Sequence, residues 1–340
     1  MKKIIICILA LFLLNSCAPA RSQASSVDFF AMDTYMTVTV YGADSDAASA
    51  AKSRILELED KFDRTDPESE ISRINAAGVS GCEVSEDTAH VISLSLYYGA
   101  VSDGAFDISI GSVMDAWGFG MNDSGTPSYR VPGDTELAEL LKAVGADMVS
   151  VLGSSVKTAS DDVVIDLGGV GKGYAAQAAA DVLRAEGVKS ALLSLGGNIC
   201  AVGSKPDGSP WRAAIQSPSG DGYAGVIEFS DASVVTTGGY RRYFEENGVR
   251  YHHVIDPATG RPADSGLLSA TVVCSDSAVA DILSTAVFVM GEEKALALRE
   301  RIGGFELVLL TDDGRAVVTS GLADCFELAE GSGFVLDNAD

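Results

Sequence analysis

SDSAVADILSTAVFVMG, residues Ser275 to Gly291, is the most informative stretch of this sequence. Asp276 or Ser277 can cap a helix here, because either side chain can accept hydrogen bonds from the first free amides. The positions that follow are apolar on nearly every side of that helix. A helix that is apolar all round is enclosed by protein. The stretch therefore predicts a helix over Ser277–Met290 that is buried on all sides.

Two polar residues of this helix, Asp281 and Thr285, are four positions apart and so share one helix face. A buried carboxylate without a partner costs several kcal/mol, so Asp281 must have one. A carboxylate beside a hydroxyl offers hard oxygen ligands, which suit magnesium or calcium. The alternative is a buried aspartate that is hydrogen-bonded to Thr285 and to backbone amides. Periodicity alone does not decide between them.

The remaining pattern predicts an α+β protein, a mixed α/β chain in which largely antiparallel sheets are packed with helices. Further helices are expected at Asp44–Phe62, Glu86–Val101, Asp134–Val144, Gly173–Glu186 and Glu292–Arg301. Strands are expected at Tyr35–Tyr41 and at VSVLG, VVIDL, SALLSL, WRAAIQ, GVIEF, YHHVI and LSATVVC. No linker divides these elements, so we expect one compact unit.

VVIDLGGVGKGYAAQAAADVL, residues Val163 to Leu183, predicts a strand that ends at Asp166, a glycine-rich turn and a helix that opens near Gly173. The amides at such a helix start suit a phosphate group, and Lys172 adds a cation. The stretch is not a P-loop, which needs Ser or Thr after the lysine and a glycine in place of Asp166. It also lacks the GxGxxG spacing of a Rossmann site. A tight turn without any ligand is the alternative.

RYHHVIDPATGRP, residues Arg250 to Pro262, holds two of the three histidines of the chain. Successive side chains of a strand point to opposite faces, so His252 and His253 cannot chelate one metal together. The preceding TTGGYRRYFEENG predicts a hairpin with Arg241 and Arg242 pointing in opposite directions.

The sequence has 340 residues and a formal net charge of −24, which becomes −26 if its first sixteen residues are removed. Such an acidic body argues against nucleic-acid binding, and an anionic substrate would need local cations. Cys82, Cys200, Cys274 and Cys325 form no CxxC pair, so zinc and redox motifs are absent from the sequence. Disulfides among them are neither predicted nor excluded.

The first residues, MKKIIICILALFLLNSC, combine a basic start with a short apolar run. Residues 1–16 are therefore expected to be a signal peptide. LLNSC resembles a bacterial lipobox, which predicts cleavage before Cys17, lipidation of Cys17 and a polar tether over residues 17–27 ahead of a body over residues 28–335. We expect an exported lipoprotein, anchored to the cell membrane on its extracytoplasmic (periplasmic) side. The alternative is an ordinary cleaved signal in which Cys17 is incidental.

Seven segments, in order, resemble the FAD:protein FMN transferase family, the ApbE-type flavin transferases. They are AMDTYMTV, FDRTDPESEISRIN, DGAFDISIG with WGFG, IDLGGVGKGYA, LLSLGGNI, TTGGYRRYFEENGVRYHHVIDPATGRP and ADILSTAVFVMG. The resemblance covers about Phe29 to Leu328 and implies a T-fold-like architecture. It also implies FAD as substrate, Mg²⁺ as metal, and transfer of the FMN half to a Ser or Thr hydroxyl with release of AMP. The implied partner is an exported acceptor protein, such as a redox-pump subunit, with an Asp-x-x-Ser/Thr-Gly-Ala-Ser/Thr motif.

The resemblance also implies roles for particular residues. Contacts with FAD are implied for Met32, Ala105, Phe106, Asp107, Asp166, Lys172 and Ile255. The metal ligands would be the side chains of Asp281 and Thr285 and the carbonyl of Gly169. His253 matches the histidine of H-[IV]-[IV]-D-P-x-T-G, so we expect it to titrate near neutral pH and to help remove the proton of the acceptor hydroxyl. Asp256 would orient the loop or act as the base, and His252 would be incidental.

Other functions are compatible with the same residues. A metal-dependent FAD pyrophosphatase would release FMN and AMP to water, and a non-catalytic lipoprotein would only bind FAD. A surface scaffold would bind no flavin. The family pattern also has departures, such as Thr65 at a position where an aromatic residue often packs on the flavin.

Overall fold

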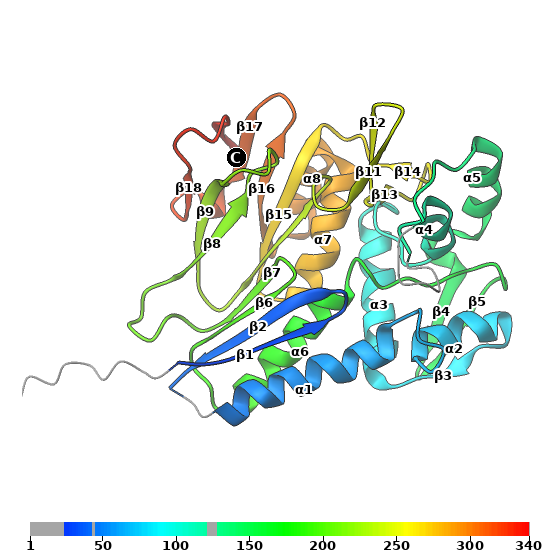
Figure 1. Ribbon diagram of the computed structural model, residues 1–340, viewed down its shortest axis with the longest axis horizontal. Coiled ribbons are helices and arrows are strands. Elements are labelled where there is room, and N and C mark those ends of the chain that lie inside the picture. The colour runs from blue at the N-terminus through cyan, green and yellow to red at the C-terminus, as the bar shows by residue number, and fades with distance from the viewer. Residues whose placement is uncertain (1–23, 43–44, 121–127, 340) are drawn as a thin grey trace, which may run out of the picture.

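A nine-stranded sheet runs through the centre of the molecule (Figure 1). The computed structural model describes residues 24–42, 45–120 and 128–339. The predicted signal peptide and the predicted lipidation site at Cys17 lie outside these residues. The first strand, β1, begins at Ala24, four residues before the expected start of the body.

The sheet has the strand order β1-β2-β6-β7-β10-β15-β16-β17-β19. All neighbouring pairs are antiparallel except β17 and β19, so the predicted class of largely antiparallel sheets with packed helices is confirmed. The strands are β1 (Ala24–Ala31), β2 (Thr34–Tyr41), β6 (Ala191–Leu195), β7 (Asn198–Val202), β10 (Ser233–Gly238), β15 (Leu267–Cys274), β16 (Phe305–Thr311), β17 (Arg315–Thr319) and β19 (Val335–Ala339).

Smaller sheets and the helices surround this sheet. The small sheets comprise β8 (Trp211–Gln216), β9 (Tyr223–Phe229) and β18 (Phe326–Leu328); β3 (Cys82–Glu83), β4 (Val149–Leu152) and β5 (Ser155–Thr158); β11 (Tyr243–Glu246) and β12 (Val249–His252); and β13 (Ile255–Asp256) and β14 (Arg261–Pro262). The described helices are α1 (Ser45–Phe62), α2 (Glu70–Ala77), α3 (Glu86–Val101), α4 (Gly111–Trp117), α5 (Asp134–Leu140), α6 (Gly171–Ala185), α7 (Ser277–Met290) and α8 (Glu292–Ile302).

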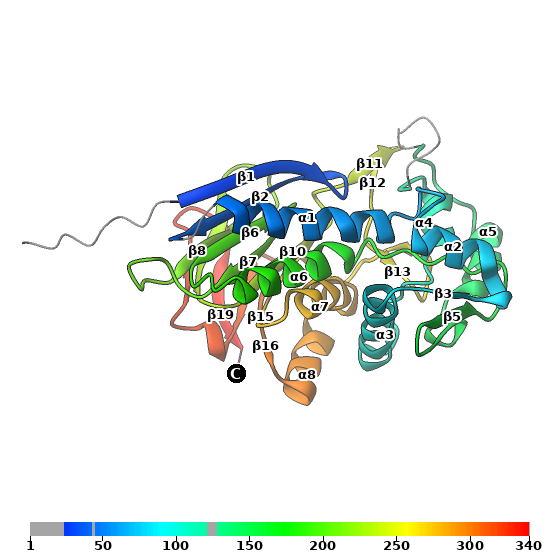
Figure 2. The same ribbon diagram turned by 90° about the horizontal axis from the view of Figure 1, so that it is seen from below.

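Each face of the large sheet is covered by a different layer. Helices α1, α6 and α7 lie side by side on one face, as Figure 2 shows from below. The β8-β9-β18 sheet covers part of the other face, where Trp211 and Phe326 pack with Val308 and Val318 of the large sheet. Apolar side chains of the sheet therefore alternate between two cores, as expected for a sheet that is covered on both sides.

Helix α7 occupies the position that its composition predicts. Ten of its fourteen residues are buried, and it packs against α6 and against strands β10 and β15. Asp276 is its N-cap, with its side chain accepting hydrogen bonds from the amides of Ala278 (2.8 Å) and Val279 (3.1 Å). Within the described ranges, no helix is both long and apolar enough to cross a bilayer.

The predicted strand at VVIDL is wrong. Only Val164 makes a bridge, to Ile110, and the segment otherwise runs as extended chain towards α6. One edge of the segment makes only two backbone bonds to described parts of the chain, from the Asp166 amide to Ile108 (2.8 Å) and from the Gly111 amide to Val164 (3.0 Å). On the other edge Asn75 accepts from the amide of Ile165 (2.8 Å) and donates to its carbonyl (3.1 Å). These bonds take the place of a ladder with a neighbouring strand.

YHHVI is likewise not one strand, because β12 ends at His252 and Ile255 belongs to β13. The alternation of faces nevertheless persists. His252 stacks edge-on against Phe288 of α7, with ring centroids 5.5 Å apart. His253 instead lies near Phe119, 6.4 Å between centroids.

Candidate active site

A cavity with a volume of about 380 Å³ lies between the β1–β2 turn, the start of α6, the end of β10 and helix α7. This volume is typical of a small-molecule site. Of the twelve residues for which the sequence predicts a catalytic, FAD-binding or metal-binding role, eleven line this cavity. They are Met32, Ala105, Phe106, Asp107, Asp166, Gly169, Lys172, His253, Ile255, Asp281 and Thr285.

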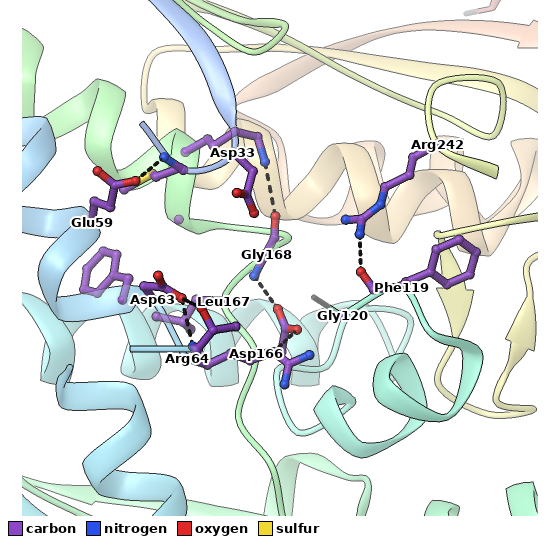
Figure 3. Close-up of a pocket in the computed structure, with 15 residues that line it drawn as sticks. Asp33, Glu59, Asp63, Arg64, Phe119, Gly120, Asp166, Leu167, Gly168 and Arg242 are labelled. Carbon is purple, nitrogen blue, oxygen red and sulfur yellow. Dashed lines mark hydrogen bonds and ion pairs between the residues drawn. The ribbon is translucent and has the colours of Figure 1, made fainter. Parts of the chain in front are cut away.

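A second cavity of about 200 Å³ adjoins the first (Figure 3). It lies between the turn that carries Asp33, the end of α1 and the segment that carries Asp166 and Gly168. Lys172 and Arg242 line both cavities. Asp33 and Asp166 also line both, so the two spaces meet beside two cations and two carboxylates.

Asp281 is 5% exposed, and its nearest partner is an amide, not Thr285. Gly173 donates its amide hydrogen to Asp281 Oδ2 at 2.8 Å. Burial raises the pKa of Asp281, while Lys172, the Gly173 amide and Asn198 oppose this rise. The hydroxyl of Thr285 lies 3.4 Å from that of Thr237 on β10. Of the alternative in which Thr285 and backbone amides bond to Asp281, the structure therefore shows the amide bond and not the bond to Thr285.

The start of α6 is built around this bond. The helix begins at Gly171, two residues before the expected position. A Cβ on Gly173 would lie 2.4 Å from the carbonyl oxygen of Ser277 and 2.4 Å from Cβ of Asp281, so only glycine lets α6 and α7 come this close. The expected row of free amides for a phosphate is reduced, because the Gly171 amide bonds to Leu167 and the Gly173 amide to Asp281.

The oxygen atoms around Asp281 fit a magnesium ion that takes some of its ligands from a bound substrate, rather than a metal ion whose ligands all come from the protein. Among residues 24–42, 45–120 and 128–339, no three His, Cys, Asp or Glu side chains are grouped to hold an ion. Asp281, Thr285 and the Gly169 segment line one side of the cavity. One carboxylate supplemented by hydroxyl and carbonyl oxygens is typical of Mg²⁺ sites that take further oxygens from substrate phosphates. The residues therefore fit a magnesium ion that arrives with a phosphorylated ligand.

Asp166 is held by an arginine that the sequence reasoning missed. Arg64 Nε donates to Asp166 Oδ2 at 2.8 Å, and its Nη2 donates to Asp115 Oδ1 at 2.6 Å. Burial opposes the charge of Arg64, but the two carboxylates outweigh it and raise the pKa of Arg64. The signal was present in FDRTDPES, where a basic residue interrupts an acidic run. Its partner is 102 residues away in the chain, however.

Met32 and Asp33 form the turn between β1 and β2, with φ angles of 47° and 59°. Two consecutive residues with positive φ are typical of the tight hairpin turn that matches the twist of its strands. The amide of Met32 donates to Glu59 Oε1 at 2.6 Å, which fixes the turn against α1. Burial raises the pKa of Glu59. The turn is thus held at the junction of both cavities.

Phe106 and Asp107 approach the cavity from the segment between α3 and α4. Phe106 packs on the backbone of Gly169, where a Cβ would lie 2.8 Å from the ring. Asp107 Oδ1 accepts from the amide (2.8 Å) and the hydroxyl (2.6 Å) of Ser109. Burial raises the pKa of Asp107, although these two bonds oppose it.

His253 does not titrate near neutral pH, contrary to the expectation. Its separation from bulk water lowers its pKa to about 4, so the ring is neutral at pH 7. Nδ1 lies 3.1 Å from the carbonyl oxygen of Arg242. Because a carbonyl can only accept, Nδ1 carries the proton and Nε2 has the lone pair. His253 is therefore a neutral hydrogen-bond acceptor on the cavity wall.

The prediction of a catalytic base at Asp256 is not supported by the structure, because Asp256 does not line the cavity. Its Oδ1 accepts from the amide of Ala258 at 2.9 Å, and its Oδ2 lies 3.3 Å from the hydroxyl of Thr259. An aspartate bonded two residues ahead in this way holds a turn. Of the two roles left open for it, orientation of the loop is the one that its contacts support.

The fold and the cavity together define a class: an α+β protein with a small-molecule site between a glycine-rich helix start and a buried helix. The model of the ApbE family matches residues 32–309. The FAD:protein FMN transferase of Vibrio cholerae serotype O1 is 35% identical over 280 residues, covering 80% of this chain and 82% of that protein. The Escherichia coli K12 FAD:protein FMN transferase is 32% identical over 315 residues, with 88% of this chain and 89% of that protein covered.

Solved structures give the same result. The ApbE protein of Thermotoga maritima has a TM-score of 0.80 at 31% identity, covering 91% of this chain and 97% of that one. The flavin transferase ApbE of Vibrio cholerae has a TM-score of 0.80 at 28% identity, covering 89% of this chain and 99% of that one. This chain belongs to the ApbE family.

Proposed function

We propose that this chain is an FAD:protein FMN transferase, which moves the FMN half of FAD to a Ser or Thr hydroxyl of an acceptor protein and releases AMP. The observation that carries the proposal is that eleven of the twelve residues to which the resemblance assigns a role line one cavity, although they come from segments far apart in the chain. The names of the relatives support FAD as the substrate and a protein as the acceptor.

Asp281, Thr285 and the carbonyl of Gly169 would hold a magnesium ion beside the diphosphate. When bound, this ion supplies positive charge that neutralises phosphate oxygens. Lys172 adds a second positive charge on the same cavity wall. Local charge of this kind is needed, because the chain as a whole has a net charge of −24 and repels an anionic substrate.

In the reaction, the acceptor oxygen forms a bond to the phosphorus of the FMN half, and the bond from that phosphorus to the AMP oxygen breaks. The proton of the acceptor hydroxyl passes by way of Nε2 of His253 to solvent. A neutral imidazole with a pKa of about 4 is a weak base. Phosphoryl transfer goes through a loose transition state in which positioning matters more than deprotonation. His253 therefore acts mainly by orienting the hydroxyl.

The test is to incubate the full chain, kept in detergent, with FAD, magnesium and a peptide that carries an Asp-x-x-Ser/Thr-Gly-Ala-Ser/Thr motif. Mass spectrometry is expected to show a peptide gain equal to FMN minus water, with AMP as the other product. Asp281→Ala is expected to reduce the rate by at least about a hundredfold, because a lost charge-stabilising group typically costs that much.

Arg250→Gln is the control, since Arg250 lies on the β11–β12 hairpin and pairs only with Glu245 among the described residues. It is expected to leave the rate unchanged. If the peptide stays unmodified and free FMN appears, the activity is that of a pyrophosphatase and not of a transferase. An unmodified peptide beside intact FAD would reject catalysis altogether.

We also propose that the protein is an exported lipoprotein, held on the extracytoplasmic face of a membrane through Cys17. The lipobox-like LLNSC supports this proposal. Cells that express the chain and are fed an alkyne-labelled fatty acid are expected to label it, and Cys17→Ser is expected to abolish the label. Equal labelling of both chains would contradict a lipid at Cys17.

A further inference from the structure

Arg241 and Arg242 differ from the other arginines of the described residues. Each of the other eleven has at least one carboxylate within ion-pairing distance, whereas Arg241 and Arg242 have none among residues 24–42, 45–120 and 128–339. The chain has 48 acidic and 24 basic residues, so carboxylates are plentiful. Two adjacent arginines without a carboxylate partner in the described part of the chain therefore point to a bound anion.

Both arginines line the larger cavity, and each is held by a different segment of its wall. Arg241 Nη1 donates to the carbonyl of Gly196 at 3.1 Å, in the turn between β6 and β7. Arg242 donates to the carbonyl of Phe119, and its guanidinium carbon lies 5.9 Å from the centre of the Phe119 ring (Figure 3). A guanidinium has five N–H donors, so each arginine keeps donors for a ligand after these bonds.

Asn198 is a further donor in this cavity, and it lies beside Asp281, whose pKa it helps to lower. The residue is 3% exposed and is the first residue of β7. Its Nδ2 makes no hydrogen bond within the part of the chain that the structure describes. An asparagine amide has two N–H donors, so one remains for a ligand even with Asp281 as its neighbour.

The arrangement of the two cavities indicates where the anion binds. Arg242 and Lys172 line both, together with Asp33 and with Asp166, whose charge is already paired with Arg64, so two cations without a carboxylate partner among the described residues lie at this boundary. A ligand that has a planar ring system at each end and a negative charge in its middle matches this arrangement. A guanidinium binds phosphate oxygens in a two-pronged geometry that a lysine cannot reproduce.

We infer that Arg241, Arg242 and Asn198 bind the phosphate oxygens of the substrate, with Arg242 beside Lys172 at the junction of the two cavities. This inference rests on the proposed function, because it takes FAD as the substrate. It adds three residues that the sequence reasoning did not assign to ligand binding. It also gives the acidic chain a cationic site of its own, separate from any metal.

The test measures binding of inorganic pyrophosphate, FAD and riboflavin to the full chain by calorimetry, with EDTA present so that only the protein's own groups contribute. Arg241→Gln and Arg242→Gln are each expected to weaken pyrophosphate and FAD about tenfold or more, which is the loss of one charge-assisted contact. Riboflavin, which has no phosphate, is expected to bind all chains alike. Arg242→Lys keeps the positive charge but loses the two-pronged guanidinium, and it is expected to bind pyrophosphate and FAD with intermediate affinity.

Arg250→Gln is the matched control, because it removes the same charge from the neighbouring hairpin, outside both cavities. The inference is overturned if Arg241→Gln and Arg242→Gln bind pyrophosphate as tightly as Arg250→Gln does. Circular dichroism checks that each variant is folded, and the lysine variant at the same position replaces any glutamine variant that is not. Flavin transfer by the unaltered chain is scored separately. If the arginine variants keep their pyrophosphate affinity while the unaltered chain transfers flavin, only this inference is rejected. If the variants lose affinity but the unaltered chain transfers no flavin, only the proposed function is rejected.

Discussion

His253 has a stability consequence that follows from its position alone. In the unfolded chain its imidazole takes up a proton near its ordinary pKa of 6.5, but in the folded protein only near 4. Between these values the unfolded state binds more protons. The stability of the folded state is therefore expected to fall as the pH drops from about 6.5 towards 4, in addition to any contribution from other groups.

His253→Gln removes this contribution, because glutamine does not titrate in that range. The loss in unfolding free energy between pH 6.5 and pH 4 is expected to be smaller in His253→Gln than in the unaltered chain. Urea denaturation at the two pH values measures it. An equal or larger loss in the variant would show that His253 is protonated in the folded state.

At the residue scale, sequence reasoning identified groups by their type and was less successful with their partners. Asp281 was expected to be buried and paired, and it is. Its partner, the Gly173 amide, is 108 residues away and could not be inferred from helical spacing. The pKa of His253 was missed for a related reason, since it depends on enclosure by segments distant in the chain. Roles of individual residues in catalysis remain predictions.

At the scale of elements, the contact between α6 and α7 is the most sensitive to substitution. Gly173→Ala would place a methyl group 2.4 Å from the carbonyl of Ser277, so the helices must separate. Overpacking of this kind costs about 1–3 kcal/mol. Thermal unfolding is expected to show a lower Tm for Gly173→Ala, and flavin transfer is expected to fall because Asp281 moves with α7.

Gly133→Ala is the matched control for this substitution. Gly133 precedes α5 with a φ of −75°, and a Cβ there would meet no atom within 4 Å. Its Tm is expected to stay close to that of the unaltered chain. If Gly173→Ala and Gly133→Ala unfold at the same temperature, the close approach of α6 and α7 does not contribute to stability.

Elements with strong local signals were predicted well. α3 and α7 occupy the expected ranges, Glu86–Val101 and Ser277–Met290, because polar caps and a sharp change in composition mark their ends. VVIDL was misread because β-branched residues favour a strand only where a strand is available to pair with. Here Asn75 of α2 bonds to the backbone at Ile165 instead. Nothing in the local sequence of either segment indicates the other.

At the scale of the whole molecule, the acidic charge is expected to slow the approach of FAD. The net charge of −24 repels an anion over the Debye length, which is about 30 Å at 0.01 M salt and about 8 Å at 0.15 M. Added salt in this range is expected to raise the association rate constant for FAD. Stopped-flow flavin fluorescence measures it, with uncharged riboflavin as the control. A rate constant that falls with salt would mean that the cations of the cavities dominate even at long range.

The class of the fold could be predicted from the alternation of strand and helix patterns, but the order of the strands could not. β10 lies between β7 and β15, and β19 adds to β17 in parallel, after an excursion through β18 of another sheet. Such pairings depend on which apolar faces meet in three dimensions, and several orders bury the same side chains. The cavity is a product of this order, because its wall combines segments from Met32 to Thr285.

Strands β1 and β19 are the outermost strands of the nine-stranded sheet. With a spacing of about 4.8 Å between neighbouring strands, they are separated by roughly 40 Å across the sheet. A circular permutation that joins Ala24 to Ala339 would need a connecting peptide of at least about a dozen residues, since an extended residue spans about 3.4 Å. Reporter domains fused at these two positions would sit on opposite rims of the protein, too far apart for a short linker to bring together.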